Sequence, residues 1–196
     1  MSALAGTSPV TGLFVAIVGP SGAGKDALIR GLAGRLGESD GVFYARRVVT
    51  RCADAFEDHD TLAEEAFAAA RAQGRFALAW SAHGLDYGVP REIEARLAAG
   101  GVVVCNVSRA MVAEVRRLYR PSLIVLVTAR PETLAARLAA RGREDGASRR
   151  RRLARSAVAE VAFEPDATID NDGALNEAVA RLHDLVVRSL RSAVPR

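Results

Sequence analysis

A glycine-rich run near the start of the chain has the residue types that bind phosphate. It consists of Gly19-Pro20-Ser21-Gly22-Ala23-Gly24-Lys25-Asp26 and fits the pattern G-x-x-x-x-G-K, with Asp26 where Ser or Thr is usual. Glycines allow successive backbone N–H groups to turn inward around phosphate oxygens, and the start of a following helix adds partial positive charge. Lys25 would reach the β and γ phosphates as a point charge. The run therefore predicts a nucleotide-binding loop.

Asp26 departs from the usual pattern, and two roles fit it. Ser or Thr at this position would place a neutral hydroxyl on Mg²⁺, whereas the carboxylate of Asp26 is a hard anionic ligand that Mg²⁺ accepts directly or through water. Asp is also favoured at the first turn of a helix, where it caps the backbone or balances the positive end. Asp26 is thus the candidate metal ligand, and a purely capping role stays open beside it.

Apolar runs and helical periodicities alternate along the chain. The strands and helices that they predict must hold this loop in place. Continuous apolar runs predict strands at Leu13–Val18, Val42–Thr50, Phe76–Trp80, Val102–Cys105, Leu123–Thr128 and Ala167–Ile169. Helical spacing predicts helices at Asp26–Leu36, Thr61–Gln73, Arg91–Ala99, Met111–Tyr119, Pro131–Ala140 and Leu175–Leu190, and a further helix that ends at Val161. Such alternation predicts an α/β fold with a parallel sheet, helices on both faces and ligands at the carboxyl ends of the strands.

Composition and charge exclude several classes of protein. The chain has 196 residues, of which 49% are hydrophobic, as expected for one globular domain. Cys52 and Cys105 lie far apart, so neither a disulfide framework nor a zinc site is expected. No apolar run approaches the ~18 residues of a membrane span, and the segment from Met1 to Thr11 is small and uncharged, unlike a signal peptide. We therefore expect a soluble, cytoplasmic protein with no membrane partner.

The basic charge is carried almost entirely by arginine. The chain has one Lys, which is Lys25, beside 26 Arg, and its formal net charge is +4. Clustered arginines neutralise phosphates, which raises nucleic acid as a partner. The densest run, Arg149 to Arg152, lacks the interleaved aromatics of a single-strand binding surface. A small phosphorylated ligand needs the same charge, so nucleic acid is not expected as a partner.

The order of the motifs resembles that of the guanylate kinase superfamily. The resemblance rests on the loop at 19–26, on Val49-Thr50-Arg51, on Tyr87-Gly88, on the Arg-rich segment around 137–155 and on Asn171-Asp172-Gly173. It implies a three-layer P-loop NTPase fold in a single kinase domain over 12–192, after a flexible tail at 1–11. Within that domain it implies a small acceptor-binding insert near 45–90 and a lid near 137–155. A GTPase is not expected, since no Asn-Lys-x-Asp segment follows the loop.

Several motifs are closer to one family within that superfamily. The guanine-reading positions of guanylate kinase hold other residues here, and the chain resembles the ribose 1,5-bisphosphate phosphokinase family instead. The shared elements are Gly24-Lys25-Asp26, Thr50-Arg51, Glu57-Asp58-His59, Trp80, Tyr87-Gly88-Val89, Asn106 with Ser108-Arg109-Ala110, and Arg141-Gly142-Arg143-Glu144. The resemblance implies ATP and Mg²⁺ as cofactors, and transfer of a phosphoryl group to the 1-phosphate of ribose 1,5-bisphosphate in phosphonate catabolism. No general base is expected, because a phosphate oxygen is already ionised.

The resemblance also assigns roles to individual residues. Catalytic roles fall to Lys25, Arg137, Arg141 and Arg143. Nucleotide binding falls to residues 19–26, Arg141, Asn171 and Asp172. Acceptor binding falls to Arg51, His59, Tyr87, Asn106, Arg109 and Arg152.

Simpler explanations of some of these residues stay open. Tyr87 could be a packing ring and His59 an exposed loop histidine, while Trp80 is expected in the core. The lid arginines could form a solvated helix face. For the whole chain, the alternatives are guanylate kinase or another nucleoside monophosphate kinase, and a non-catalytic guanylate-kinase-like binding module. A homodimer is one arrangement that the sequence neither requires nor excludes.

Overall fold

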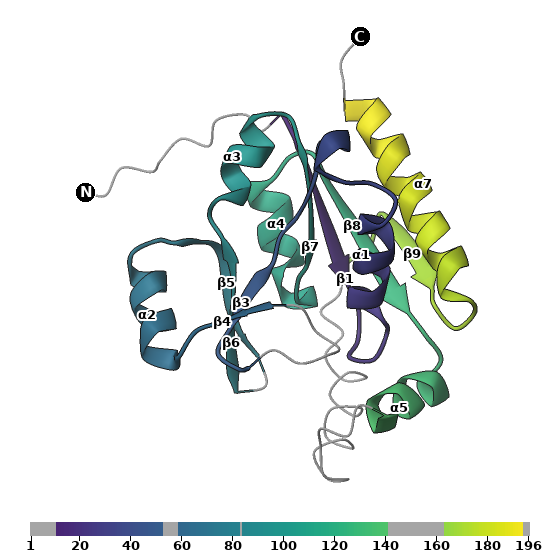
Figure 1. Ribbon diagram of the computed structural model, residues 1–196, viewed down its shortest axis with the longest axis horizontal. Helices are drawn as coiled ribbons and strands as arrows, with labels where there is room; N and C mark the ends of the chain where they lie inside the picture. Colours follow the sequence, from purple (N-terminus) through teal and green to yellow (C-terminus); the bar gives the residue numbers. More distant parts are fainter. Residues whose placement is uncertain (1–10, 53–58, 83, 141–162, 194–196) are drawn as a thin grey trace.

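A parallel sheet forms the centre of the molecule (Figure 1). The computed structural model describes residues 11–52, 59–82, 84–140 and 163–193. The five strands of this sheet lie in the order β2-β7-β1-β8-β9, and every neighbouring pair is parallel. The strands are β1 Leu13–Val18, β2 Val42–Tyr44, β7 Val102–Asn106, β8 Ser122–Thr128 and β9 Ala167–Asp170. The α/β fold class is therefore confirmed.

Helices cover both faces of this sheet, as the alternating apolar runs predict. One face is covered by α1 (Lys25–Ala33) and α7 (Leu175–Ala193), and the other by α3 (Ile93–Ala98) and α4 (Val112–Leu118). Short 3-10 turns stand at Glu38–Asp40 and Arg109–Met111, and α5 spans Pro131–Ala140. None of the described helices combines the length and the apolar composition that a membrane crossing requires.

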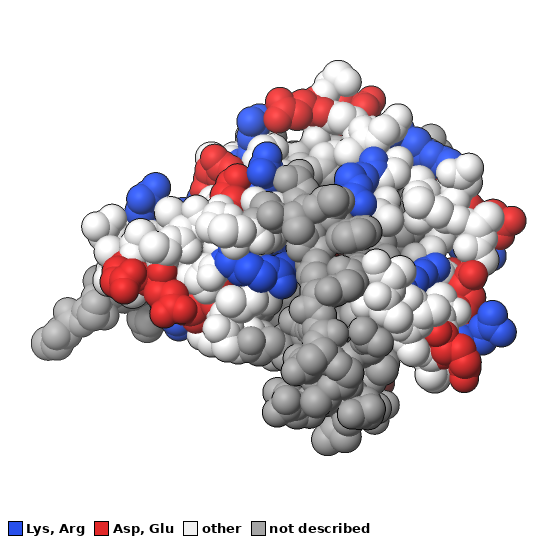
Figure 2. Space-filling view, turned by 60° about the horizontal axis from the view of Figure 1, so that its bottom comes forward, with Lys and Arg blue, Asp and Glu red and all other residues white. Residues whose placement is uncertain are grey.

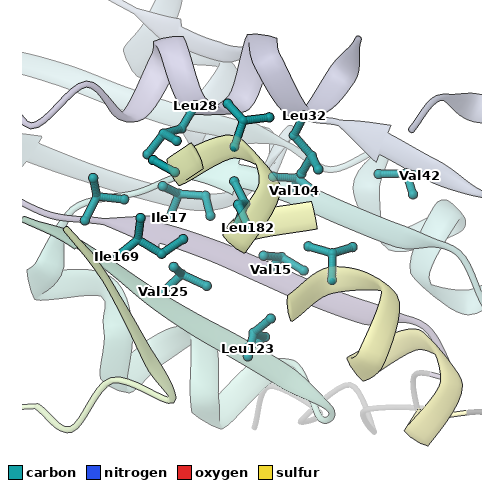
Figure 3. Close-up of a cluster of buried hydrophobic side chains, with 14 of the residues drawn as sticks. Val15, Ile17, Leu28, Leu32, Val42, Val104, Leu123, Val125, Ile169 and Leu182 are labelled. Atoms are coloured by element: carbon teal, nitrogen blue, oxygen red, sulfur yellow. The ribbon is translucent and has the colours of Figure 1, made fainter. Parts of the chain in front are cut away.

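The central strand β1 is buried along its whole length because both of its faces meet helices. Val15 and Ile17 pack toward α1 and α7, beside Leu28, Leu32 and Leu182 (Figure 3). The alternate residues Phe14, Ala16 and Val18 belong to the cluster under α3 and α4. The end of β1, and hence the loop after it, is fixed by two separate layers of packing.

A second, four-stranded sheet stands beside the first, in the order β4-β3-β6-β5. Its strands are β3 Arg47–Val49, β4 His59–Thr61, β5 Phe76–Ala82 and β6 Leu85–Pro90, and the helix α2 spans Glu64–Ala72. The strand β3 pairs in parallel with β4 and antiparallel with β6, and β5 pairs antiparallel with β6. The apolar side chains of this sheet join the same core cluster as α3 and α4.

The structure corrects several boundaries that the sequence pattern predicts. The single strand expected over Val42–Thr50 is wrong: its first half pairs with β7, and its second half pairs with β4 and β6 in the other sheet. The helix expected from Thr61 begins at Glu64, because Thr61 still belongs to β4. The sequence pattern predicts neither β4 nor β6. Both of them lie in the segment that the sequence assigns to an insert.

Other expectations agree closely with the structure. The predicted bounds of β1 and α5 match, and those of β7, β8, β9 and α7 differ by a few residues at most. Cys52 is exposed and Cys105 is buried, and both thiols are free. The Arg-rich stretch at 142–155 and the helix expected to end at Val161 lie outside the described residues.

Candidate functional site

The phosphate loop joins the carboxyl end of β1 to the first turn of α1. Its Gly19 and Gly24 have φ values of 148° and 87°, a region that side chains rarely adopt. A Cβ atom on Gly19 would collide with the carbonyl oxygen of Val127 on the neighbouring strand, and one on Gly24 would collide with the side-chain amide of Asn171. The glycines are thus required by backbone conformation and by close neighbours, and the strand–loop–helix context predicted for the loop is confirmed.

Lys25 lies over the loop that precedes it. Its Nζ donates hydrogen bonds to the carbonyl oxygens of Gly19 at 3.0 Å and Pro20 at 2.9 Å. The ammonium group is therefore held against a glycine-rich turn of the kind whose backbone N–H groups bind phosphate oxygens. A flexible stem lets Lys25 exchange these carbonyl contacts for phosphate contacts, which the planar fork of arginine would do less readily.

Two residues far along the chain support the loop from outside. The side-chain amide of Asn171, which is 3% exposed, donates to the carbonyl oxygen of Ala23 at 2.8 Å. Arg137 on α5 donates to the carbonyl oxygen of Asn171 at 2.8 Å and to those of Gly22 and Ala23 at 3.5 Å. The resemblance assigns nucleotide binding to Asn171 and a catalytic role to Arg137, and the structure brings both residues against the loop. Contact of either residue with a bound ligand stays a prediction.

Asp172 organises the beginning of α5. Its carboxylate accepts from the backbone N–H of Arg130 at 2.9 and 3.0 Å and pairs with the guanidinium of Arg130 at 3.2 Å. Hydrogen bonds from the Thr133 hydroxyl and from the backbone of Arg130 hold the pKa of Asp172 below its ordinary value. A negative group at this end of a helix satisfies backbone donors and the helix dipole. Asp172 therefore positions the helix that carries Arg137.

A cluster of three polar side chains lies beside the loop, at the start of α1. The amide of Asn106, at the end of β7, donates to Oδ1 of Asp26 at 2.9 Å. The guanidinium of Arg47 lies 3.7 Å from the same oxygen, and the side chains of Arg47 and Asp26 are only 11% and 18% exposed. Because Arg47 belongs to β3, this cluster connects the phosphate loop, the central sheet and the second sheet.

Arg47 is a site residue that the sequence reasoning missed. The Thr-Arg motif indicates Arg51 and does not include Arg47. The two arginines are four residues apart in a segment that was expected to be extended, so they should point to the same face. That alternation is the signal that could have identified Arg47. The pairing with Asp26 could not be identified in this way, since it joins a helix and a strand that are distant in the sequence.

Tyr87 and Trp80 pack together in the second sheet. Their ring centroids are 5.4 Å apart with an angle of 4° between the planes, and each residue is 9% exposed. Trp80 is a core residue, as expected. The ring of Tyr87 is a packing ring that also faces the guanidinium of Arg47, 5.8 Å from its centroid. A contact between Tyr87 and an acceptor stays a prediction.

His59 is buried, with 2% of its surface exposed, and it lies on β4. The alternative of an exposed loop histidine is therefore wrong. Its Nδ1 lies 3.1 Å from the carbonyl oxygen of Asp60, and its Nε2 has no hydrogen-bond partner among the residues that the structure describes. The ladder pairs His59 with Arg47, which places the two residues side by side in the second sheet. A role of His59 in binding substrate stays a prediction.

The remaining predicted residues are partly placed by the structure. Arg51 follows β3, where its carbonyl oxygen accepts from the hydroxyl of Thr61 at 3.0 Å. Arg109 begins the 3-10 turn after β7, which Ser108 caps by accepting from the N–H of Ala110. Arg51 and Arg109 thus follow the ends of strands in different sheets. The predicted residues Arg141, Arg143 and Arg152 lie outside the described residues.

Basic side chains lie on either side of the centre of the face at the carboxyl ends of the central strands (Figure 2). In Figure 2 the basic side chains on this face lie nearer the middle than most of the acidic ones. The described residues hold no group of three or more His, Cys, Asp or Glu side chains that could bind a metal by themselves. A divalent ion here would need oxygen ligands from a bound phosphate, which is how proteins commonly hold Mg²⁺.

Comparisons with known proteins agree with this geometry. A family model described as an AAA domain matches residues 15–158. A ribose 1,5-bisphosphate phosphokinase from Methylobacterium radiotolerans is 48% identical over 171 residues, which cover 87% of this chain and 95% of that protein. One from Brucella melitensis is 43% identical over 188 residues, with 91% and 96% covered.

A solved structure extends the similarity to the fold. The crystal structure of guanylate kinase from Anaplasma phagocytophilum superimposes with a TM-score of 0.70 at 18% identity. The superposition covers 93% of this chain and 88% of that one. At this identity the likeness concerns the fold alone.

Proposed function

Because this chain belongs to the ribose 1,5-bisphosphate phosphokinase family, we propose that it transfers the γ-phosphoryl group of ATP to the 1-phosphate of ribose 1,5-bisphosphate. A bond forms between an oxygen of the 1-phosphate and the γ phosphorus, and the bond between that phosphorus and the β–γ bridging oxygen breaks. The products are 5-phosphoribosyl 1-diphosphate and ADP. In the cell this reaction would serve phosphonate catabolism.

The observation that carries the proposal is the complete phosphate loop with Lys25 held over it. A Cβ atom on Gly19 or Gly24 would collide with neighbouring protein atoms, so glycine is required at both positions for the loop to keep this conformation. Lys25 donates to carbonyl oxygens of the same loop, within reach of any phosphate bound there. The residues present therefore fit ATP, which supplies the phosphoryl group when bound. Lys25 would stabilise the charge on the transferred group.

The second sheet supplies the acceptor side. Its β3 brings Arg47 to Asp26 at the start of α1. The proposed acceptor-binding set consists of Arg51, His59 and Tyr87 from the segment of the second sheet and of Asn106 and Arg109 at the end of β7. Both substrates are polyanions, so positive side chains are needed to bring them together. No proton has to leave the acceptor phosphate, so positioning and electrostatics suffice for catalysis. Arg141, Arg143 and Arg152 would add charge from the lid, a role that rests on the family resemblance.

Asp26 fits the role of a Mg²⁺ ligand in this arrangement. Both of its contacts are to Oδ1, and Oδ2 receives no hydrogen bond in the described part of the chain. A carboxylate oxygen beside bound phosphates is a common component of Mg²⁺ sites. Asn106 would hold the carboxylate in a fixed orientation. The two free cysteines fit a reducing compartment, and we expect the enzyme in the cytoplasm.

One experiment tests the proposal against its alternatives. Purified protein with MgATP is offered ribose 1,5-bisphosphate, GMP, AMP or no acceptor, and formation of ADP is followed. Turnover on ribose 1,5-bisphosphate, with 5-phosphoribosyl 1-diphosphate as the product, is expected. Turnover on GMP alone would show a guanylate kinase. A folded protein that binds ATP and turns over none of the acceptors would show a binding module. Lys25→Ala, assayed in parallel, controls for contaminating kinases.

A further inference from the structure

Arg47 lies between the phosphate loop, where the nucleotide is proposed to bind, and the second sheet, which is proposed to bind the acceptor. It begins β3 in the second sheet, yet its guanidinium reaches Asp26 in the first turn of α1, directly after Lys25. The side chain is 11% exposed, so most of it is removed from water. Charged side chains are buried to this extent only where something compensates the lost hydration.

The compensation that the described residues provide for Arg47 is small. A guanidinium has five N–H donors, and the nearest carboxylate oxygen lies 3.7 Å away, beyond the range of a hydrogen bond. That oxygen already accepts from Asn106 at 2.9 Å. Among the described residues no hydrogen bond satisfies the donors of Arg47. The guanidinium therefore has donors available for an anion that is not part of the protein.

Arg137, which also lies beside the loop, makes different contacts. Its guanidinium donates to the carbonyl oxygens of Asn171, Gly22 and Ala23, so its donors already have partners within the protein. Arg137 supports the loop, whereas Arg47 has a similar position near the loop without such contacts. The difference indicates that burial alone does not explain Arg47.

The guanidinium of Arg47 is also oriented in advance. It lies over the ring of Tyr87 at 5.8 Å from the centroid, and Tyr87 in turn stacks on Trp80. Contact with an aromatic face favours a fixed plane for the guanidinium and leaves its edges open. An oriented fork of donors is the group that binds a phosphate through two parallel hydrogen bonds.

We propose that Arg47 binds the acceptor phosphate that receives the transferred group. This inference rests on the proposed phosphokinase function and adds a specific residue to it. Arg47 links β3 to the start of α1, which is where the phosphates of the donor and of the acceptor must meet. In the absence of an acceptor, Asp26 balances its charge at a distance. A phosphate offers more oxygen acceptors and more negative charge than the one carboxylate oxygen of Asp26 that lies near Arg47. When the acceptor is bound, the guanidinium therefore donates its hydrogen bonds to the phosphate.

The competing explanation is that Arg47 only neutralises Asp26. Under that explanation, loss of Arg47 harms the site because it leaves Asp26 without a counter-charge. Replacing Asp26 as well would then restore binding of the acceptor. If Arg47 contacts the acceptor phosphate, the second replacement restores nothing, because the missing contact is with the ligand.

The test measures binding of each substrate separately. Wild type, Arg47→Gln, Arg47→Lys and the double variant Arg47→Gln/Asp26→Ser are titrated with ribose 1,5-bisphosphate and, separately, with ATP by calorimetry. We expect Arg47→Gln to weaken acceptor binding by about 10- to 100-fold, the cost of losing charge-assisted hydrogen bonds, while its ATP binding changes by less than about twofold. Arg47→Lys keeps the positive charge but lacks the planar fork of donors, so its affinity for the acceptor should lie between those of wild type and Arg47→Gln.

Arg46→Gln is the matched control. It removes the same charge one residue earlier, from a side chain that is 54% exposed and paired with Asp60 at 3.1 Å, and its acceptor binding should equal that of wild type. Thermal unfolding of each variant shows whether it folds, and Arg47→Lys keeps the test valid if Arg47→Gln does not. Unchanged acceptor binding in Arg47→Gln, or its recovery in the double variant, would overturn the inference. Absence of turnover by wild type on ribose 1,5-bisphosphate would instead overturn the proposed function.

Discussion

The side-chain amide of Asn171 donates a hydrogen bond to the carbonyl oxygen of Ala23, 148 residues earlier in the chain. Asn171 directly follows β9, the edge strand of the central sheet, and its own backbone N–H donates to the carbonyl oxygen of Thr128 at the end of β8. The phosphate loop is therefore fixed by a residue that the neighbouring strands hold in place. Loop geometry depends on the edge of the sheet as well as on its own glycines.

Asn171→Ala should loosen the loop and destabilise the protein. The variant leaves the carbonyl oxygen of Ala23 without its 2.8 Å partner in a buried place, which costs about 1–3 kcal/mol of unfolding free energy. Weaker ATP binding should accompany this loss, because the loop backbone is no longer held. Denaturant unfolding and calorimetric titration with ATP measure the two effects. The exposed Asn176→Ala, five residues further on, is the control, and equal unfolding midpoints for the two variants would contradict the prediction.

Gly24→Ala should impair nucleotide binding more than folding. A methyl group at this position would meet the amide of Asn171, and the φ of 87° is unfavourable for alanine. The loop must shift to relieve strain of about 1–3 kcal/mol, which corresponds to an ATP affinity lower by about 5- to 150-fold.

Gly34→Ala is the matched control for this glycine. Gly34 caps α1 with a φ of −73°, and no atom lies nearer than 3.6 Å to the position of its Cβ. Titration with ATP and thermal unfolding of both variants provide the comparison. If Gly24→Ala binds ATP as tightly as Gly34→Ala, the close contact between Gly24 and Asn171 does not shape the site.

The elements with local sequence signals could be predicted, and those defined by distant pairing could not. An uninterrupted apolar run identifies β1, and an early proline followed by helix formers identifies α5. In β6, however, Gly88 and Pro90 suggest a break. The structure accommodates Gly88 in a strand because the ring of Phe76 on β5 covers it, with ring atoms 2.6 Å from where a Cβ would lie. Gly88 is therefore suited to its place in the strand only because of its cross-strand neighbour Phe76, which the local sequence does not reveal.

The same limit applies to the candidate site. The loop at 19–26 is a contiguous motif, so its place between a strand and a helix follows from the sequence. The pair formed by Asp26 and Arg47 joins the first turn of α1 to β3 of the second sheet at 3.7 Å, and neither residue indicates its partner by spacing or periodicity. His59 stands between two acidic residues, which suggests exposure, but pairing with β3 buries it.

Stability should fall as the pH rises above about 9. Burial raises the pKa of the Cys105 thiol from its ordinary value of 9.0 to about 12, and burial likewise raises that of Tyr44 to about 12. In the unfolded chain these groups lose protons at lower pH than in the folded protein, so the unfolded state is favoured as the pH rises toward 12. Each such group lowers the unfolding free energy by about 1.4 kcal/mol per pH unit within its window.

Replacing Cys105 should flatten this pH dependence. Cys105→Ala removes one of the titrating groups, so its unfolding free energy should decline less steeply between pH 9 and 11 than that of wild type, whatever its stability at pH 7. Urea unfolding at several pH values measures the slope. Cys52 is exposed, and Cys52→Ala should keep the slope of wild type. A Cys105→Ala variant as steep as Cys52→Ala would show that the buried thiol does not govern alkaline sensitivity.

Lys25→Ala should abolish phosphoryl transfer and leave the protein folded. Nζ makes two hydrogen bonds to loop carbonyl oxygens in a half-buried place, so its loss should cost only about 1–2 kcal/mol of unfolding free energy. Removing a positive group that stabilises the transferred phosphoryl costs about 100-fold or more in rate. Lys25→Arg should recover little, because the planar fork does not fit the position of a point charge. ADP formation and thermal unfolding measure the two effects, with the exposed Arg30→Ala on the same helix as the control. A rate for Lys25→Ala within threefold of that control would remove the basis for placing this lysine, the only one in the chain, at the reacting phosphates.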